Sequence, residues 1–236
     1  MEPDETPTLP VVRVGVMPLV DVAPLVMASV LRLDRRHGVQ LRLSREASWA
    51  ALRDKLLGGA LDMAQALYGM VYGVHLGIGG PRAPMALLMG LNRNGQGISI
   101  SRRLADSGVR DLPSLAAHLR ASGGRSVLAQ TFPTGTHAMW LYHALAAHGV
   151  HVLPPPLMVD ALRDGQADVV SVGAPWNRLG EIEGVAVPLL DSAEVWPEHP
   201  EKALAAPAAY ADRHPDICRA VVAAVLEACR WLDADP

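Results

Sequence analysis

One segment of the sequence combines residue types that suit the binding of a small anion. Thr131-Phe-Pro-Thr-Gly-Thr-His137 brings hydroxyl groups, a glycine and an imidazole into a short run. The run lies between a predicted strand and a predicted helix. Its free backbone N–H groups and the positive end of the helix dipole are therefore directed at the same place as these side chains. This arrangement favours an oxyanion as ligand.

Further polar groups occur at other predicted strand ends and crossings. Ser48-Trp49 begins a helix directly after a strand, and Gly173-Ala-Pro-Trp-Asn177 follows another strand in the same way. Gln96 offers both a donor and an acceptor, and Lys202 supplies a cation. Singly, each is a common loop feature. Together they border one inferred cleft, because open α/β sheets bind ligands beyond their strand ends.

Signatures of catalysis and of metal binding are missing from the sequence. It contains no G-x-S-x-G, no H-E-x-x-H, no phosphate-binding loop and no C-x-x-C. His143 and His148 are five residues apart, about 140° out of register on a helix, so they do not share a face. We therefore expect a protein that is not an enzyme and that needs no cofactor and no metal.

The composition of the chain limits which partners it can bind and in which compartment it is expected. The 236 residues carry a formal net charge of −3 with both signs interspersed, which gives no basic patch for nucleic acid. No run of about 18 apolar residues occurs, so we expect no membrane insertion. The first ten residues are acidic and proline-rich, unlike a secretory leader. They predict a cytoplasmic protein, with a periplasmic location as the alternative if a leader was removed.

The hydrophobic pattern alternates between strands and helices, which is typical of doubly wound α/β sheets. The alternation begins with a buried strand over 11–16 and a helix from Asp21 to Leu33, with Asp21 as its N-cap. It restarts near residue 95. We therefore predict two lobes with a ligand cleft between them: lobe 1 over 11–95, lobe 2 over 96–198, and a return to lobe 1 over 199–236. The last segment is predicted to be mainly helical from Ala205 to Asp233.

Seven segments of the sequence match a known family when they are taken together. They are Val14-Gly-Val-Met-Pro-Leu-Val-Asp21, Leu43-Ser-Arg-Glu-Ala-Ser-Trp49, Arg53-Asp-Lys-Leu56, Leu91-Asn-Arg-Asn-Gly-Gln96, Thr131-Phe-Pro-Thr-Gly-Thr-His137, Gly173-Ala-Pro-Trp-Asn177 and His199-Pro-Glu-Lys-Ala203. In these segments the chain resembles the nitrate/bicarbonate/sulfonate-binding family, the substrate-binding proteins of ABC importers. The resemblance runs from about Val11 to Asp233 and implies a type II periplasmic-binding-protein fold.

Within that family, the segment Ala64 to Gly80 looks most like cytoplasmic nitrate/nitrite sensors, which hold an RNA-binding antiterminator until the anion arrives. The resemblance implies an antiterminator protein as partner and nitrate or nitrite as ligand. The positions that match the family's anion site are Trp49, Gln96, Thr131, His137, Pro155 and Lys202. In this interpretation Lys202 neutralises the anion, Gln96 and His137 donate hydrogen bonds, and Trp49 excludes water.

The sequence departs from the family at three places. Ala174 stands where glutamate is usual, Gln65 stands where exported members commonly have histidine, and relatives continue beyond residue 236. The absent segment is expected to help complete lobe 1. Two alternatives stay open: the receptor of an ABC importer, and an enzyme resembling a thiamine-precursor synthase. The enzyme needs a reactive lysine, and Lys55 and Lys202 are the only lysines.

Overall fold

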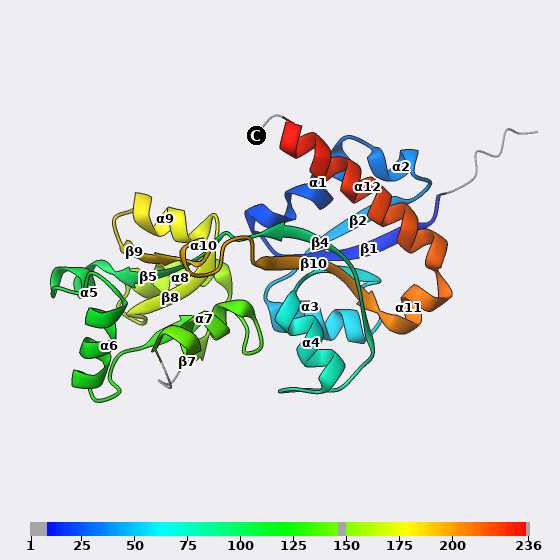
Figure 1. Ribbon diagram of the computed structural model, residues 1–236. Helices are drawn as coiled ribbons and strands as arrows, with labels where there is room; N and C mark the ends of the chain where they lie inside the picture. Colours follow the sequence, from blue (N-terminus) through cyan, green and yellow to red (C-terminus); the bar gives the residue numbers. More distant parts are fainter. Residues whose placement is uncertain (1–8, 146–149, 235–236) are drawn as a thin grey trace, which may run out of the picture.

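Figure 1 shows the computed structural model, which describes residues 9–145 and 150–234. The chain forms two lobes, each built on a five-stranded mixed sheet. The chain passes from the first sheet to the second between β4 and β5, and it returns from β9 to β10. The predicted α/β class and the two-lobed architecture are thereby confirmed.

The sheet of the first lobe has the order β2-β1-β3-β10-β4, with β1 parallel to β2 and β3, and with β10 antiparallel to β3 and β4. Apolar side chains of α1, α2 and α12 cover one face, and those of α3 and α4 cover the other. The strands are β1 (Val11–Val16), β2 (Gln40–Arg45), β3 (Met63–Leu67), β4 (Met85–Arg93) and β10 (Pro200–Pro207). The helices of this lobe are η1 (Val20–Val22), α1 (Ala23–Val30), α2 (Leu33–Arg36), α3 (Trp49–Leu57), α4 (Tyr68–Leu76), α11 (Ala208–Arg213) and α12 (Pro215–Ala234).

The sheet of the second lobe has the order β7-β6-β8-β5-β9, in which β5 is antiparallel to both β8 and β9. Helices α5, α6 and α7 pack on one face, and α8 and α9 pack on the other. The strands are β5 (Gln96–Ser101), β6 (Leu128–Gln130), β7 (Val150–Val152), β8 (Val169–Gly173) and β9 (Ala186–Asp191). The helices are α5 (Arg102–Asp106), α6 (Leu112–Ala121), α7 (Thr136–Leu145), η2 (Pro155–Leu157), α8 (Met158–Arg163), α9 (Trp176–Ile182) and α10 (Ser192–Val195).

One prediction of local structure needs its boundary moved, and another was wrong. The segment from Ala205 to Asp233 is mainly helical as predicted, in α11 and α12, but Ala205 and Ala206 belong to β10 and are fully buried between β3 and β4. Alanine favours helices, but strand pairing and burial override that preference here. Asp21 does not cap α1, which begins at Ala23. Its side chain turns instead toward Gln65 and Lys202.

The two lobes are in direct contact. Trp176 Nε1 of the second lobe donates a hydrogen bond of 2.9 Å to the Pro18 carbonyl, and Phe132 packs into the apolar core around α3 and α4. Thr134 approaches α4 so closely that a Cβ at Gly69 would lie 1.8 Å from its carbonyl oxygen. The lobes are therefore closed on each other, and only glycine fits at the contact.

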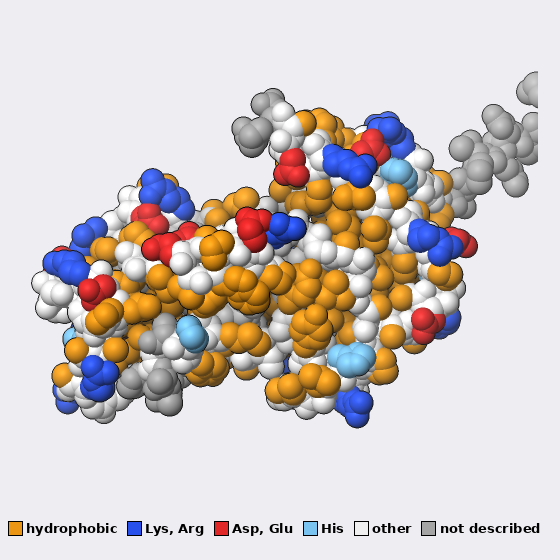
Figure 2. Space-filling model, in the orientation of Figure 1, with side chains coloured by type: hydrophobic (Ala, Val, Ile, Leu, Met, Phe, Trp, Pro, Cys, Tyr) orange, Lys and Arg blue, Asp and Glu red, His pale blue; other side chains and the backbone are white. Residues whose placement is uncertain are grey.

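The surface carries charges of both signs. On the face drawn in Figure 2, blue and red side chains are mixed, with hydrophobic groups between them. Among the helices that the structure describes, none is both long and apolar enough to cross a bilayer. Within the same residues, no group of three His, Cys, Asp or Glu side chains is placed to hold a metal ion.

Candidate anion-binding site

The centre of the candidate site is a pair of neighbouring residues on β10. The register against β4 shifts between Pro200 and Lys202, so that Glu201 is the extra residue of a β-bulge. Neighbouring side chains of a regular strand point to opposite faces, and a bulge re-aims one of them. Here both side chains reach one cluster, because the Lys202 ammonium forms an ion pair with the Glu201 carboxylate.

Lys202 is fully buried, and its charge is balanced from two elements. Besides Glu201, its Nζ lies 3.0 Å from Oδ2 of Asp21, which belongs to η1. Asp21 is in turn held by the side-chain amide of Gln65 on β3, whose carbonyl oxygen accepts a 2.7 Å hydrogen bond from the Met17 N–H. A buried charge needs such partners, since leaving it unpaired costs several kcal/mol.

The second lobe brings polar groups to the same place. Gln96, the first residue of β5, donates to the Glu201 carboxylate, and Thr136 Oγ1 donates to it at 2.7 Å. His137, in the first turn of α7, has its Nε2 3.8 Å from Glu201 Oε1. The cluster therefore bridges the lobes, with Lys202 and Glu201 from one side and Gln96, Thr136 and His137 from the other.

Trp49 forms an apolar wall of the cluster. It is the first residue of α3, and Ser48 caps that helix by accepting a 3.1 Å hydrogen bond from the Ala51 N–H. Lys202 Nζ lies 5.7 Å from the centroid of the Trp49 ring, within the range of a cation–π interaction. The ring is buried and keeps water from the ammonium, which strengthens electrostatic interactions inside the cluster.

Several buried polar atoms around the cluster have no hydrogen-bond partner within residues 9–145 and 150–234. They include both ring nitrogens of His137, Oε1 of Gln96 and Nε1 of Trp49. A buried polar atom without a partner costs about 1–3 kcal/mol, so such a concentration is unusual for a structural core. The indole N–H and an imidazole N–H are both able to donate to an oxyanion.

Burial shapes the charge states of the cluster. Burial, together with Lys202 and His199, lowers the pKa of the His137 imidazole well below its ordinary value. Burial opposes the Lys202 charge, but Asp21 and Glu201 outweigh it and raise the pKa of the ammonium. Burial raises the pKa of the Asp21 carboxyl, and Lys202 offsets part of that rise. At neutral pH the cluster thus contains a charged lysine and a neutral imidazole.

The structure brings four of the six predicted residues into one cluster: Trp49, Gln96, His137 and Lys202. Thr131 is buried just after β6 with its hydroxyl unpartnered in the described part of the chain. Pro155 is buried as the first residue of η2. No hydrogen bond or ion pair among the described residues ties either of these two to the cluster, so their roles stay predictions.

Sequence reasoning missed four residues of the cluster: Asp21, Gln65, Thr136 and Glu201. Gln65 was noted only as a departure from the family, and Asp21 only as a cap. For Glu201 the sequence shows only a Glu-Lys pair ahead of a run of small apolar residues. Alanine is depleted in strands, so this run does not by itself predict a buried strand in which the charged pair would need partners.

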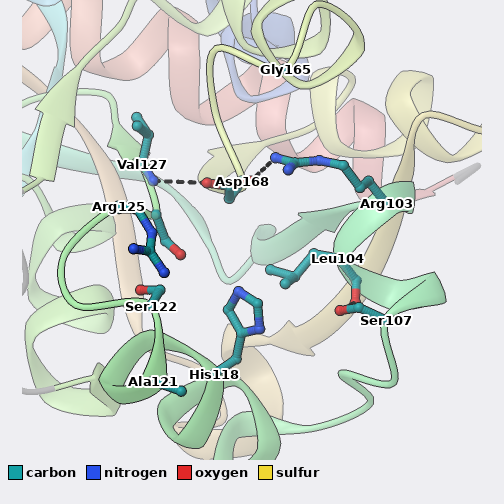
Figure 3. A pocket seen from close by; sticks show the side chains of 11 residues that line it. Arg103, Leu104, Ser107, His118, Ala121, Ser122, Arg125, Val127, Gly165 and Asp168 are labelled. Carbon is teal, nitrogen blue, oxygen red and sulfur yellow. Dashed lines mark hydrogen bonds and ion pairs between the residues drawn. The ribbon is translucent and has the colours of Figure 1, made fainter.

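A separate pocket lies away from this cluster, on the second lobe. It measures about 570 Å³ and is lined by residues that include Arg103, His118 and Arg125. Figure 3 shows Arg103 directed at Asp168, which also accepts a 2.9 Å hydrogen bond from the Val127 N–H. Asp168 pairs with Arg103, so the charge of that guanidinium is already balanced. We therefore expect the pocket to bind an anion less well than the buried cluster does.

Comparison with known proteins identifies the family. A model of the NMT1-like family matches residues 5–236. The chain belongs to the NMT1-like family. It is 34% identical over 230 residues to the nitrate import ATP-binding protein NrtC of Synechocystis, covering 93% of this chain and 34% of that one. It is 32% identical over 250 residues to the nitrate/nitrite binding protein NrtA of the same organism, covering 99% of this chain and 56% of NrtA.

A solved structure confirms the fold. The periplasmic nitrate-binding protein NrtA from Synechocystis superposes with a TM-score of 0.87 at 32% identity, covering 95% of this chain and 62% of that one. This NMT1-like chain therefore has the periplasmic-binding-protein fold. It spans about a third of the length of NrtC and about half that of NrtA. The relatives matched over most of this chain thus include nitrate-binding proteins.

Proposed function

We propose that this protein binds a small oxyanion, nitrate or nitrite, between its two lobes, and that it is not an enzyme. The observation that carries the proposal is the fully buried Lys202 ammonium beside the Trp49 ring, in a cluster to which the second lobe brings the donors Gln96 and Thr136. The relatives that bind nitrate share this fold, which supports the choice of anion.

In this proposal each of the six predicted residues has a physical role. Lys202 provides the positive charge, and Gln96, Thr131 and His137 donate hydrogen bonds to the planar oxygens. Trp49 and Pro155 close the site to water. Nitrate accepts hydrogen bonds but donates none, so a site with a cation and several donors complements it.

The proposed binding step is closure of the lobes on the anion. We assign 11–95 together with 199–236 to one moving body and 96–198 to the other. The contacts across the interface, such as Trp176 with Pro18, belong to the closed arrangement. A ligand that contacts both lobes binds the closed arrangement more tightly than the open one. This difference in affinity shifts the equilibrium toward closure.

Between the two roles considered from sequence, the comparisons favour the receptor of an importer. The relatives include a nitrate import ATP-binding protein and a periplasmic nitrate-binding protein, which supports a transport role and a periplasmic location. The cytoplasmic sensor with an antiterminator partner rests on the resemblance of Ala64 to Gly80 alone. Co-purification from cells separates the roles: a permease indicates import, and an RNA-binding antiterminator indicates sensing.

The first prediction tests Lys202. We expect Lys202→Met to lower nitrate affinity at least a hundredfold in titration calorimetry, because the buried anion loses its neutralising charge. Lys55→Met is the matched control, since Lys55 is the only other lysine and is half exposed against Glu46. We expect that control to bind nitrate normally.

The fold of the variant is checked before its affinity is interpreted. Removing Lys202 leaves Asp21 and Glu201 without their cation, so thermal unfolding must show a cooperative transition for Lys202→Met. Gln96→Leu is a second variant that keeps all charges and removes one donor; a loss of about tenfold is expected. If unaltered, folded protein binds neither nitrate nor nitrite, the proposed function is wrong.

A further inference from the structure

Glu201 is the residue of the cluster that the anion-binding role does not explain. Its carboxylate is 1% exposed and accepts from Gln96 and Thr136 while it pairs with Lys202. These are donors that an incoming oxyanion would use. An ionised Glu201 therefore already satisfies the groups that make the site attractive to an anion.

The net charge of the cluster also disfavours an added anion while both carboxyls are ionised. One buried ammonium, Lys202, faces two buried carboxyls, Asp21 and Glu201, and the imidazole of His137 is neutral. With both carboxyls ionised the cluster carries a net negative charge. Adding an anion would then place like charges together in a buried site, which costs several kcal/mol. A proton taken up with the anion removes that cost.

We propose that Glu201 is an internal competitor of the anion, and that nitrate binding is coupled to the uptake of one proton by the Glu201 carboxylate. The inference rests on the proposed function. The proton comes from solvent and converts the carboxylate into a carboxylic acid. Its O–H becomes a hydrogen-bond donor, and Lys202, Gln96 and Thr136 become free to contact the anion.

The groups that face Glu201 come from every element around it. They are Lys202 on β10, Asp21 on η1 and His137 on α7, whereas β5 contributes the uncharged Gln96. His199, just before β10, acts on His137, and its ring forms a hydrogen bond of 2.7 Å with Ser192.

The pKa of the Lys202 ammonium is raised and that of His137 is lowered, so neither changes charge at neutral pH. Two carboxyls are then the candidates to accept the proton. Burial raises the pKa of Asp21, but among the described residues the Asp21 side chain pairs only with Lys202 and Gln65, both in the first lobe. Glu201 is the one that holds the donors of both lobes.

Titration calorimetry with nitrate tests the proposal. For the unaltered protein we expect the Kd to rise about tenfold per pH unit wherever Glu201 is ionised before binding. Measurements in buffers of different ionisation enthalpy should give close to one proton taken up per nitrate. This proton count needs no variant, so it holds even if a substitution disturbs folding.

Glu201→Gln should bind nitrate with no dependence on pH and with no proton uptake, and at high pH it should bind more tightly than the unaltered protein. Glu198→Gln is the control, because Glu198 lies three residues earlier and is exposed against Arg93. Its nitrate Kd should change with pH as steeply as that of the unaltered protein. The Kd of Asp21→Asn is also expected to depend on pH.

Three results would overturn the proposal. The first is unchanged pH dependence in Glu201→Gln, which would assign the proton to another group. The second is loss of nitrate binding in folded Glu201→Gln, which would make the carboxylate a partner of the ligand. The third is pH-independent binding by the unaltered protein, which would leave the proposed function standing. Absence of nitrate binding at every pH would instead overturn the proposed function.

Discussion

His137 is a buried imidazole whose ring nitrogens have no hydrogen-bond partner among the residues described. Burial lowers its pKa well below the ordinary value of 6.5, with smaller contributions from Lys202 and His199. In the unfolded chain the imidazole takes up a proton near pH 6.5. The unfolded state therefore binds more protons below that pH, and stability present above pH 6.5 is lost as the pH falls.

We expect the free energy of unfolding, measured with urea in the absence of anion, to fall between pH 7 and pH 5. One proton contributes at most about 1.4 kcal/mol per pH unit. In His137→Asn the free energy of unfolding should decrease less between pH 7 and pH 5. His143→Asn, at an exposed position of the same helix, should leave this decrease unchanged. Equal slopes in the His137→Asn variant and the unaltered protein would show that another group titrates.

At the scale of the element, α3 is a helix whose N-cap can be recognised in the sequence and whose first residue belongs to the site. Ser48 caps the helix, and Trp49 is its first residue. Ser48→Ala should lower the free energy of unfolding by about 1 kcal/mol, because the Ala51 N–H loses its partner. Fraying of the first turn should also loosen Trp49 and weaken nitrate binding severalfold in calorimetry. Ser48→Asp keeps an acceptor at the helix start and should restore both quantities.

A cap in the other lobe provides the control for Ser48. Ser101 accepts a 3.3 Å hydrogen bond from the Leu104 N–H at the start of α5, and neither residue belongs to the cluster. Ser101→Ala should reduce stability and leave nitrate affinity unchanged. If Ser48→Ala also leaves affinity unchanged, the cap is structural only and Trp49 is held by packing.

Elements such as α3 were predictable because their signals are local: a serine cap, an apolar period and the glycine at position 58 that ends the helix. The strand β10 could not be predicted from local signals. Its alanines favour a helix by themselves, and only pairing with β3 and β4 makes the segment a strand. The role of Glu201 depends on a bulge whose position follows from the register with β4. Such non-local pairing leaves no periodic signal in one sequence.

The same distinction applies to the site. Lys202, Gln96, His137 and Trp49 were found because each lies beside a loop or terminus with a recognisable composition. Asp21 was seen as a helix cap, since an acidic residue before an apolar run has that local meaning. Its contact with Lys202 joins residues 181 positions apart in the chain. Only the folded lobe brings them together.

At the scale of the whole molecule, closure of the lobes depends on α4. A Cβ at Gly69 would lie 1.8 Å from the Thr134 carbonyl oxygen of the other lobe. Backbone cannot move aside cheaply, so Gly69→Ala should hold the lobes apart. Alanine also favours a helix over glycine by up to about 1 kcal/mol, so the first lobe should be no less stable. The variant thus separates folding from closure.

We expect Gly69→Ala to bind nitrate at least tenfold more weakly in calorimetry while its unfolding midpoint without anion is equal or higher. Gly73→Ala is the graded comparison: its Cβ would meet the Thr134 side chain at 2.8 Å, and a side chain can rotate away. Its loss of affinity should be smaller. Small-angle scattering should show compaction by nitrate in the unaltered protein and little in Gly69→Ala. Normal affinity in Gly69→Ala would mean that the anion is held without the contact between α4 and Thr134, and that the binding step is local rather than a movement of lobes.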